Sequence, residues 1–210
     1  MYIALLAMLA ASLLFGMLVY SMLPDVVASH WNAEGKADGY SSKTSFVLLM
    51  PAIMLVTSLI LILVPRLDPR RKNIEQFQEI YNGFVVFIAF FLFYIHSLSL
   101  LYNLGMIRNI ILWIIPIFAA LSFYLGFLMK KNRPNWFIGI RTPWTLTSDH
   151  VWYKTHNLAS KLFAASGFII LIGLLLPALA IFLMVIPLLL ITLYLCVYSY
   201  IEYHKETDET

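Results

Sequence analysis

The sequence predicts an all-α membrane protein: a polytopic bundle of six transmembrane helices, with an amphipathic interfacial helix before the fifth. Three observations support this prediction. Of the 210 residues, 61% are hydrophobic and only 12% are charged, which is about half the charged fraction of soluble domains. Apolar runs long enough for the ~20 residues of a membrane-spanning helix recur along the chain. All 14 lysines and arginines fall outside these runs.

Six spans follow from the apolar runs and from the residues that interrupt them. The first run lacks the basic residues that precede the apolar core of a signal peptide, so we expect a retained anchor helix. Ser41 and Ser42 are suited to cap the second span. The last run, Leu162–Ile201, is about twice the length that crosses a bilayer, so we expect it to fold back at Pro177. The predicted spans are Tyr2–Leu23, Thr44–Val64, Ile80–Leu104, Ile110–Met129, Phe163–Leu176 and Leu179–Ile201.

A further helix is predicted between the fourth and fifth spans. Thr147 or Ser148 is its expected N-cap, and Asp149 lies in its first turn, where the helix dipole favours an anion. We expect this helix to lie at the membrane surface and to run into the fifth span. Glu202–Thr210 is expected to be a short acidic tail. Helical spacing places four residues on one face of the surface helix: Trp152, His156, Ala159 and Phe163.

The distribution of lysine and arginine predicts the orientation in the membrane. The loops after the second and fourth spans carry four and six of these residues, and every other connection carries two or fewer. Because such residues concentrate on the cytoplasmic side, we expect both termini in the cytoplasm of a cell-membrane protein. The chain then divides into a two-helix hairpin with an extracellular loop, residues 1–65, and a four-helix portion, residues 66–210. The cytoplasmic loop of the second part spans residues 130–161.

The outer loop, Asp25–Lys43, concentrates polar residues. His30, Glu34 and Asp38 recur every four residues, which on a helix would place three metal ligands on one side. Gly35 disfavours a helix here, so a compact loop with His and Asp bonded to backbone groups is a second interpretation, and a docking surface is a third. The candidate partner-binding residues of this loop are Asp25, His30, Asn32, Asp38 and Lys43.

The inner loop carries six basic residues against one acid, Asp149. Contact with anionic lipid head groups accounts for part of this charge. Arg141 could bond a helix C-terminus, a lipid phosphate or a carboxylate. The three tryptophans of the loop could form an interfacial aromatic belt, and we interpret His156 as a packed, hydrogen-bonded histidine. The candidate partner-binding residues here are Asn135, Gly139, Arg141, Thr142, Trp144, Trp152 and His156.

His96 is the one ionisable His, Asp, Glu, Lys or Arg inside a predicted span. Ionisable groups at that depth mark functional sites, and a water-filled cavity reaching His96 would indicate a transporter or channel. A neutral histidine is also stable there when it hydrogen-bonds a neighbour, and Ser97 and Ser99 are the expected partners. Cys196 is the single cysteine, so an intrachain disulfide is excluded. We predict no cofactor and no direct binding of nucleic acid.

Two blocks of residues identify a family. The first block reads LPD at 23–25, HWN at 30–32 and DGY at 38–40, and it ends at Lys43. The second block begins at Asn135 and reads GIRTPWTL at 139–146, VW at 151–152 and TH at 155–156. In this order they resemble the SdpI family of bacterial and archaeal membrane proteins. The first block is similar to the domain of unknown function that opens many members, and the second is similar to the family's signature segment.

The resemblance implies a function in toxin immunity. The family is named for the protein that protects cells against the SdpC killing peptide, and in that system the protein also holds a cytoplasmic repressor at the membrane. The implied partners of this chain are the lipid bilayer, an extracellular toxin peptide and a cytoplasmic repressor protein. A small transporter or channel is the alternative function. A metal-dependent membrane enzyme is third, because the sequence has no evident nucleophile–base pair, phosphate loop or hydrolase motif.

Overall fold

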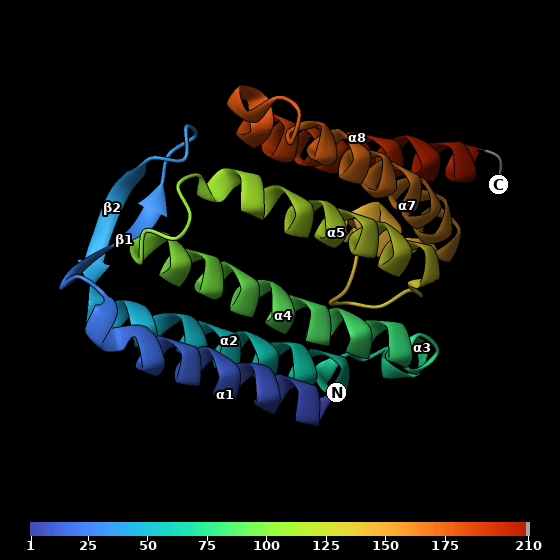
Figure 1. Cartoon of the computed structure of the whole chain (residues 1–210). Coiled ribbons are helices and arrows are strands. Elements are labelled where there is room, and N and C mark those ends of the chain that lie inside the picture. Colours follow the sequence, from blue (N-terminus) through green and yellow to red (C-terminus); the bar gives the residue numbers. More distant parts are fainter. Residues whose placement is uncertain (209–210) are drawn as a thin grey trace.

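The computed structural model describes residues 1–208 and contains six long helices that lie side by side, with a small β-hairpin at one end (Figure 1). Each of the six is long and apolar enough to cross a membrane, as the sequence predicts for a multi-pass membrane protein. They are α1 (Tyr2–Val19), α2 (Lys43–Leu67), α4 (Gln78–Asn103), α5 (Ile110–Lys131), α7 (Asp149–Ile172) and α8 (Ala180–Asp208). The short elements are β1 (Val26–Trp31), β2 (Ala37–Ser42), α3 (Arg71–Glu75), α6 (Pro143–Thr147) and single 3-10 turns at Tyr20–Met22 and Pro177–Leu179.

The helix ends follow local capping chemistry. Ser42 Oγ accepts a hydrogen bond from the Ser45 N–H at 3.2 Å, and Ser148 Oγ accepts one from the Val151 N–H at 3.2 Å. Each serine therefore satisfies one of the donors that a helix leaves open at its start. Pro177 lies in the turn between α7 and α8, as predicted. These residues explain why the start of α2 and the turn between α7 and α8 could be placed from the sequence.

The helix expected before the fifth span runs into it without a break, as predicted. The fifth span therefore begins earlier than expected, as part of α7, Asp149–Ile172, rather than as Phe163–Leu176. Trp152 on this helix is fully buried, because α7 packs against both α5 and α8 along its length. The polar first half of α7 is therefore an integral part of the bundle.

The predicted acidic tail also differs. Residues up to Asp208 continue α8 as a helix, and the last two residues lie outside the described part of the chain. Glu202 accounts for this extension, because its carboxylate pairs with Lys154 on α7 at 2.7 Å and with Lys205 at 3.0 Å. The helix thus continues past the apolar run because an ion-paired group, 6% exposed, attaches it to α7.

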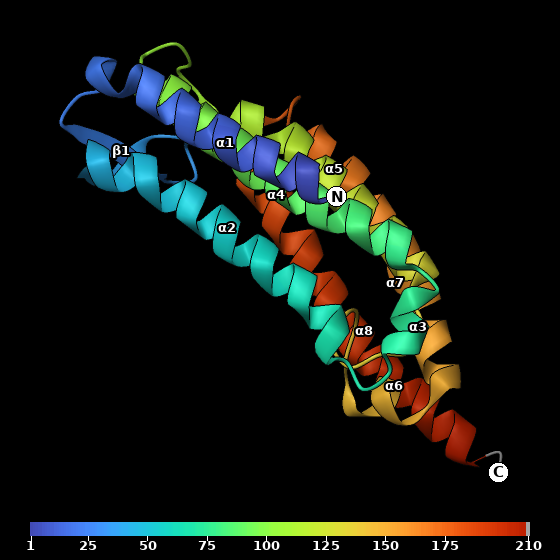
Figure 2. The same cartoon turned by 90° about the horizontal axis from the view of Figure 1, so that it is seen from below.

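The six long helices form two groups that meet in the middle of the molecule. Helices α1, α2 and α4 pack together, α5, α7 and α8 pack together, and α4 contacts α5. Figure 1 shows this order as layers, and Figure 2 shows α2 on the opposite side from α7. The α5–α7 pair is the closest, because Gly126 leaves no room for a side chain: a Cβ there would stand 2.8 Å from the Ser160 carbonyl oxygen. Small residues permit such close approach of helices in a membrane.

The outer loop forms an antiparallel hairpin rather than an irregular loop. Val26 pairs with Ser42 and Val27 with Ser41, and the register shifts between Ala28 and His30. The hairpin lies at one end of the bundle, whereas α3, α6 and the segment 132–142, which we call the connecting segment, lie at the other end (Figure 1). The two groups of candidate residues are therefore separated by the length of the bundle.

Candidate functional site

The hairpin is held on the bundle by the end of α4. The Asn103 side chain hydrogen-bonds both backbone groups of Ala28, as a neighbouring strand would. Its Oδ1 accepts from the Ala28 N–H at 2.7 Å, and its Nδ2 donates to the Ala28 carbonyl at 2.9 Å. The ring of Trp31 packs edge-on against Tyr102, with centroids 5.2 Å apart. Val27 is fully buried. An isolated two-stranded hairpin is marginally stable in water, so these contacts give the hairpin a fixed position.

The predicted residues of the hairpin form an exposed polar surface. His30 Nδ1 bonds the Asp38 carboxylate, with side chains 73% and 46% exposed, and Lys43 pairs with Asp25 at 2.8 Å. The hydrogen bond from Lys43 holds the pKa of the Asp25 carboxyl below its usual value. Asn32 Oδ1 accepts two backbone N–H groups at 3.0 Å and so shapes the turn. His30 and Asp38 thus bond each other, whereas the compact-loop interpretation expected backbone partners.

The metal-ligand set that a helix would have formed is not assembled. A spacing of four aligns side chains only on a helix, whereas here His30 lies on β1, Asp38 on β2 and Glu34 in the turn between them. Among residues 1–208, no three His, Cys, Asp or Glu side chains gather as a metal ion requires.

Two buried asparagines shape the connecting segment at the other end. Asn135 Oδ1 accepts from the N–H groups of Phe137 at 3.0 Å and Ile138 at 2.6 Å, and its Nδ2 donates to Asn132 Oδ1 at 2.9 Å. Asn132 Nδ2 in turn donates to the Ile138 carbonyl at 2.9 Å. Buried backbone groups need such partners, and in this irregular segment side chains supply them. Asn135 is therefore a structural centre of the segment and only 1% exposed.

His156 fastens the connecting segment to α7. Its Nδ1 donates to the Trp152 carbonyl at 2.8 Å and its Nε2 accepts from the Ile140 N–H at 3.0 Å, which assigns a neutral ring. The ring stacks on Trp152 with centroids 4.0 Å apart. Gly139 has φ +111°, and a Cβ there would collide with His156 Nε2 and Asn132 Nδ2. His156 is thus a packed, hydrogen-bonded histidine, as interpreted from the sequence.

Thr142 and Trp144 connect this end to α8. Thr142 caps α6 in a reciprocal capping box with Thr145, and its hydroxyl lies 2.9 Å from the Ser199 hydroxyl. The Trp144 ring packs on Tyr200 with centroids 5.1 Å apart. Thr142 is therefore buried between α6 and α8, whereas Arg141 is exposed.

The outer surface of the connecting segment carries Arg141 and Trp136. Arg141 is exposed and donates from Nη1 to the Trp136 carbonyl at 3.0 Å, and the Trp136 side chain is also exposed. Because Trp152 is fully buried, the interpretation of all three tryptophans as one interfacial belt is wrong for that residue. Arg141 and Trp136 are thus accessible to a partner, as are the exposed Arg133 and Phe137 of the same segment.

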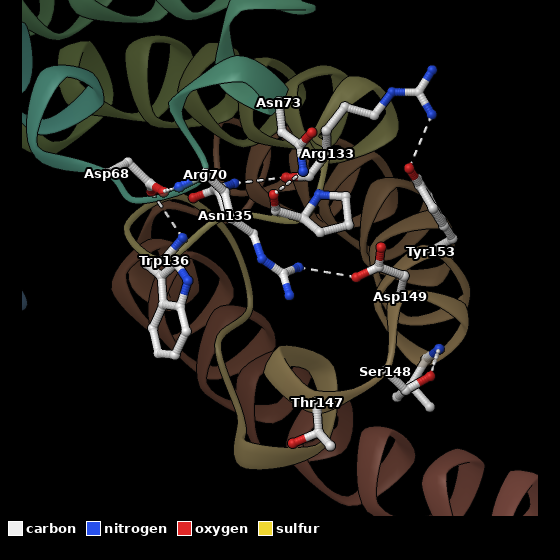
Figure 3. Close-up of polar contacts among 12 residues, drawn as sticks. Asp68, Arg70, Asn73, Arg133, Asn135, Trp136, Thr147, Ser148, Asp149 and Tyr153 are labelled. Carbon is white, nitrogen blue, oxygen red and sulfur yellow. Dashed lines mark hydrogen bonds and ion pairs between the residues drawn. The ribbon is translucent and has the colours of Figure 1, made fainter.

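A polar junction, which sequence reasoning missed, ties the connecting segment to the loop after α2 (Figure 3). The Asp68 carboxylate, in a residue 3% exposed, accepts from the N–H groups of Arg70 at 2.7 Å and Trp136 at 2.8 Å. Asn73 donates to the Pro134 carbonyl at 2.7 Å, and Arg70 pairs with Asp149 at 3.0 Å. The signal for Asp68 was an acid between Arg66 and Arg70, but no spacing rule connects residues so distant in sequence.

His96 lies in the middle of the bundle and is 1% exposed. Its Nδ1 bonds Ser12 Oγ on α1 at 2.7 Å, so the prediction of Ser97 or Ser99 as partner is wrong. Both of those serines donate to carbonyls four residues earlier in α4, a common alternative for serine in helices. His96 therefore forms a buried contact between α1 and α4 through Nδ1, whereas its Nε2 is buried without a hydrogen-bond partner among the described residues.

Two parts of the sequence, one near the N-terminus and one in the C-terminal half, match models of known protein families. Residues 131–199 match the model of the SdpI/YfhL protein family, and residues 7–55 match a domain of unknown function, DUF1648. The chain is similar to Immunity protein SdpI of Bacillus subtilis (strain 168), with 29% identity over 201 residues, covering 94% of this chain and 92% of that protein. No solved structure matches the chain.

Proposed function

We propose that this SdpI-family membrane protein is an immunity protein, which protects the cell that carries it from an extracellular toxin peptide. The observation that carries the proposal is the similarity to Immunity protein SdpI, which extends over 94% of the chain. A similarity of this extent covers far more of the chain than a single motif. The protein named in this comparison is an immunity protein, and the same role fits this chain.

The proposed orientation places the hairpin outside the cell and the connecting segment in the cytoplasm. Residues 66–72, around the end of α2, and residues 130–141, around the end of α5, carry eight of the 14 lysines and arginines, and both lie at the end opposite the hairpin (Figure 1). Positive charge on the cytoplasmic side agrees with this arrangement. A toxin peptide arriving from outside would then meet the hairpin first.

The hairpin has features suited to an extended peptide. Its sheet contains two strands, so β2 has an edge with no partner strand within the described residues. Extended peptides bind such edges by adding a strand, with specificity from side chains beside it. His30, Asp38 and the largely exposed Tyr40 would supply those side chains. We therefore propose the hairpin as the toxin-binding surface.

The connecting segment is the proposed contact for a cytoplasmic repressor. Arg141 uses one of its five donors on the Trp136 carbonyl. The remaining guanidinium N–H groups suit a carboxylate on a partner, and the exposed Trp136 ring adds an apolar contact next to them. Asn135 and His156 fix the backbone of the connecting segment, which carries both groups, by hydrogen bonds to the N–H groups of Ile138 and Ile140.

The experiment that tests the function uses Bacillus subtilis cells that lack their own Immunity protein SdpI. Cells expressing this chain are exposed to the SdpC peptide, and survival is compared with that of cells carrying an empty vector. We expect the chain to restore survival, and His30→Ala with Asp38→Ala to abolish it at an equal amount of protein in the membrane. The matched control, Glu34→Ala, should retain protection. Equal killing with and without the wild-type chain would contradict the proposal.

A further inference from the structure

A cavity of about 510 Å³ opens at the end of the bundle where α1 begins and α2 ends. Figure 1 shows these two helix ends at the same end of the bundle as α3. Its volume lies within the range of small-molecule sites. It is lined by residues of α1, α2, α3 and α4, and neither the hairpin nor the connecting segment lines it. The lining residues used below are Tyr2, Ile62, Arg66, Arg71, Glu75 and Gln78.

The charge of this cavity favours an anion. Two guanidinium groups, those of Arg66 and Arg71, line it together with one carboxylate, that of Glu75. Within residues 1–208, no carboxylate forms an ion pair with either arginine. Arg66 Nη2 donates to the Tyr2 hydroxyl at 3.4 Å, which places a cation where α1 and α2 meet. Arginine binds phosphate through paired N–H groups, so phosphate is the anion that this lining fits.

An apolar groove adjoins the polar cavity. It has a volume of about 180 Å³, lies between α1 and α2, and shares Tyr2 and Ile62 with the first cavity. Its other walls include Leu9 and Met54, which lie two turns or more inside their helices. Leu59 on its rim is 49% exposed, so the groove opens sideways towards the bilayer. The lining thus changes from cationic at the bundle end to apolar along the spans.

We propose that the cavity and the groove together bind one anionic phospholipid. Its phosphate lies between Arg66 and Arg71, and one acyl chain lies along the groove between α1 and α2. Basic pockets between transmembrane helices are known to take anionic head groups, and the adjoining groove supplies the apolar contact that a soluble phosphate compound would not use. Such a lipid would hold α1 against α2 at the end opposite the hairpin.

The test measures lipid binding to the purified full-length protein by native mass spectrometry. The protein is titrated with phosphatidylglycerol and, separately, with phosphatidylcholine. We expect wild type to bind phosphatidylglycerol more tightly, and Arg66→Gln with Arg71→Gln to weaken that binding about tenfold. The matched control, Lys131→Gln with Lys161→Gln, removes two exposed charges at the same end and should bind as wild type does. If the double arginine variant bound phosphatidylglycerol as tightly as wild type, the site would be overturned.

A second variant separates a lipid from a soluble phosphate compound without changing charge. Leu59→Trp fills the groove and should weaken phosphatidylglycerol binding, and circular dichroism of each variant verifies that the helices are formed. Glycerol phosphate should bind much more weakly than phosphatidylglycerol. If glycerol phosphate bound wild type as tightly as phosphatidylglycerol and Leu59→Trp had no effect, the lipid assignment would be wrong.

Discussion

Gly139 occupies the tightest position in the connecting segment, and its replacement gives a sharp prediction. Gly139→Ala places a Cβ against His156 and Asn132 at φ +111°. We expect the free energy of unfolding to fall by about 2–4 kcal/mol, since backbone strain and overpacking add. Thermal unfolding of the protein in detergent measures the change.

Gly105→Ala is the matched control for this prediction. Gly105 also has a positive φ, +73°, but a Cβ there meets nothing within 4 Å. Only the backbone strain should remain, about 1 kcal/mol. Equal losses for the two variants would show that the contact with His156 does not matter.

At the level of single residues, the sequence singled out candidate residues but not their partners. Asn135 and His156 each accept a hydrogen bond from a backbone N–H of the connecting segment, and Gly139 packs against His156 and Asn132. The partner of His96 was missed because Ser12 lies 84 residues away on another helix. Sequence spacing gives the face of a helix, whereas the packing of helices decides which faces meet.

Among the elements, the hairpin depends on the contact between Asn103 and Ala28. Asn103→Ala removes two hydrogen bonds to the backbone of β1, each worth about 1 kcal/mol. We expect faster hydrogen exchange across residues 26–42, with the rate in α5 and α7 unchanged. The control is Asn157→Ala, which removes an exposed side-chain bond to Lys130. If exchange in the hairpin were the same in both variants, the role assigned to Asn103 would be incorrect.

Element types followed from the sequence where one physical signal dominates. Apolar length determined the six spans, and serine caps determined two of their starts. The hairpin was missed because its strands are short and polar, and because their position depends on Asn103 and Tyr102 at the end of α4. The helix before the fifth span runs into it as predicted, but the start of that span was misplaced at Phe163, because the polar first half of α7 is compensated by Glu202 on α8.

For the whole molecule, Asp68 is the strongest polar link between the loop after α2 and the connecting segment. Asp68→Ala removes a buried carboxylate and leaves the N–H groups of Trp136 and Arg70, both part-buried, without their acceptor, so we expect the free energy of unfolding to fall by about 1.5–3 kcal/mol. Asp149→Ala removes only the partner of Arg70, in an ion pair whose side chains are 39% and 62% exposed, and should cost less than about 1 kcal/mol. Thermal unfolding of both variants compares them directly, and an equal or larger loss in Asp149→Ala would refute this ranking.

The arrangement of the whole molecule separates the two candidate surfaces by the length of the bundle, and the proposed function requires them on opposite sides of the membrane. Single cysteines in a Cys196→Ala background test this requirement. Lys36→Cys lies in the hairpin turn, and His150→Cys lies at the exposed start of α7.

The decisive measurement is labelling of these two cysteines in intact cells with a maleimide that does not cross the membrane. We expect the residue introduced at position 36 to react in intact cells, and the one at position 150 to react only after the cells are permeabilised. Labelling of both from the same side would contradict the account of an outward hairpin and an inward connecting segment.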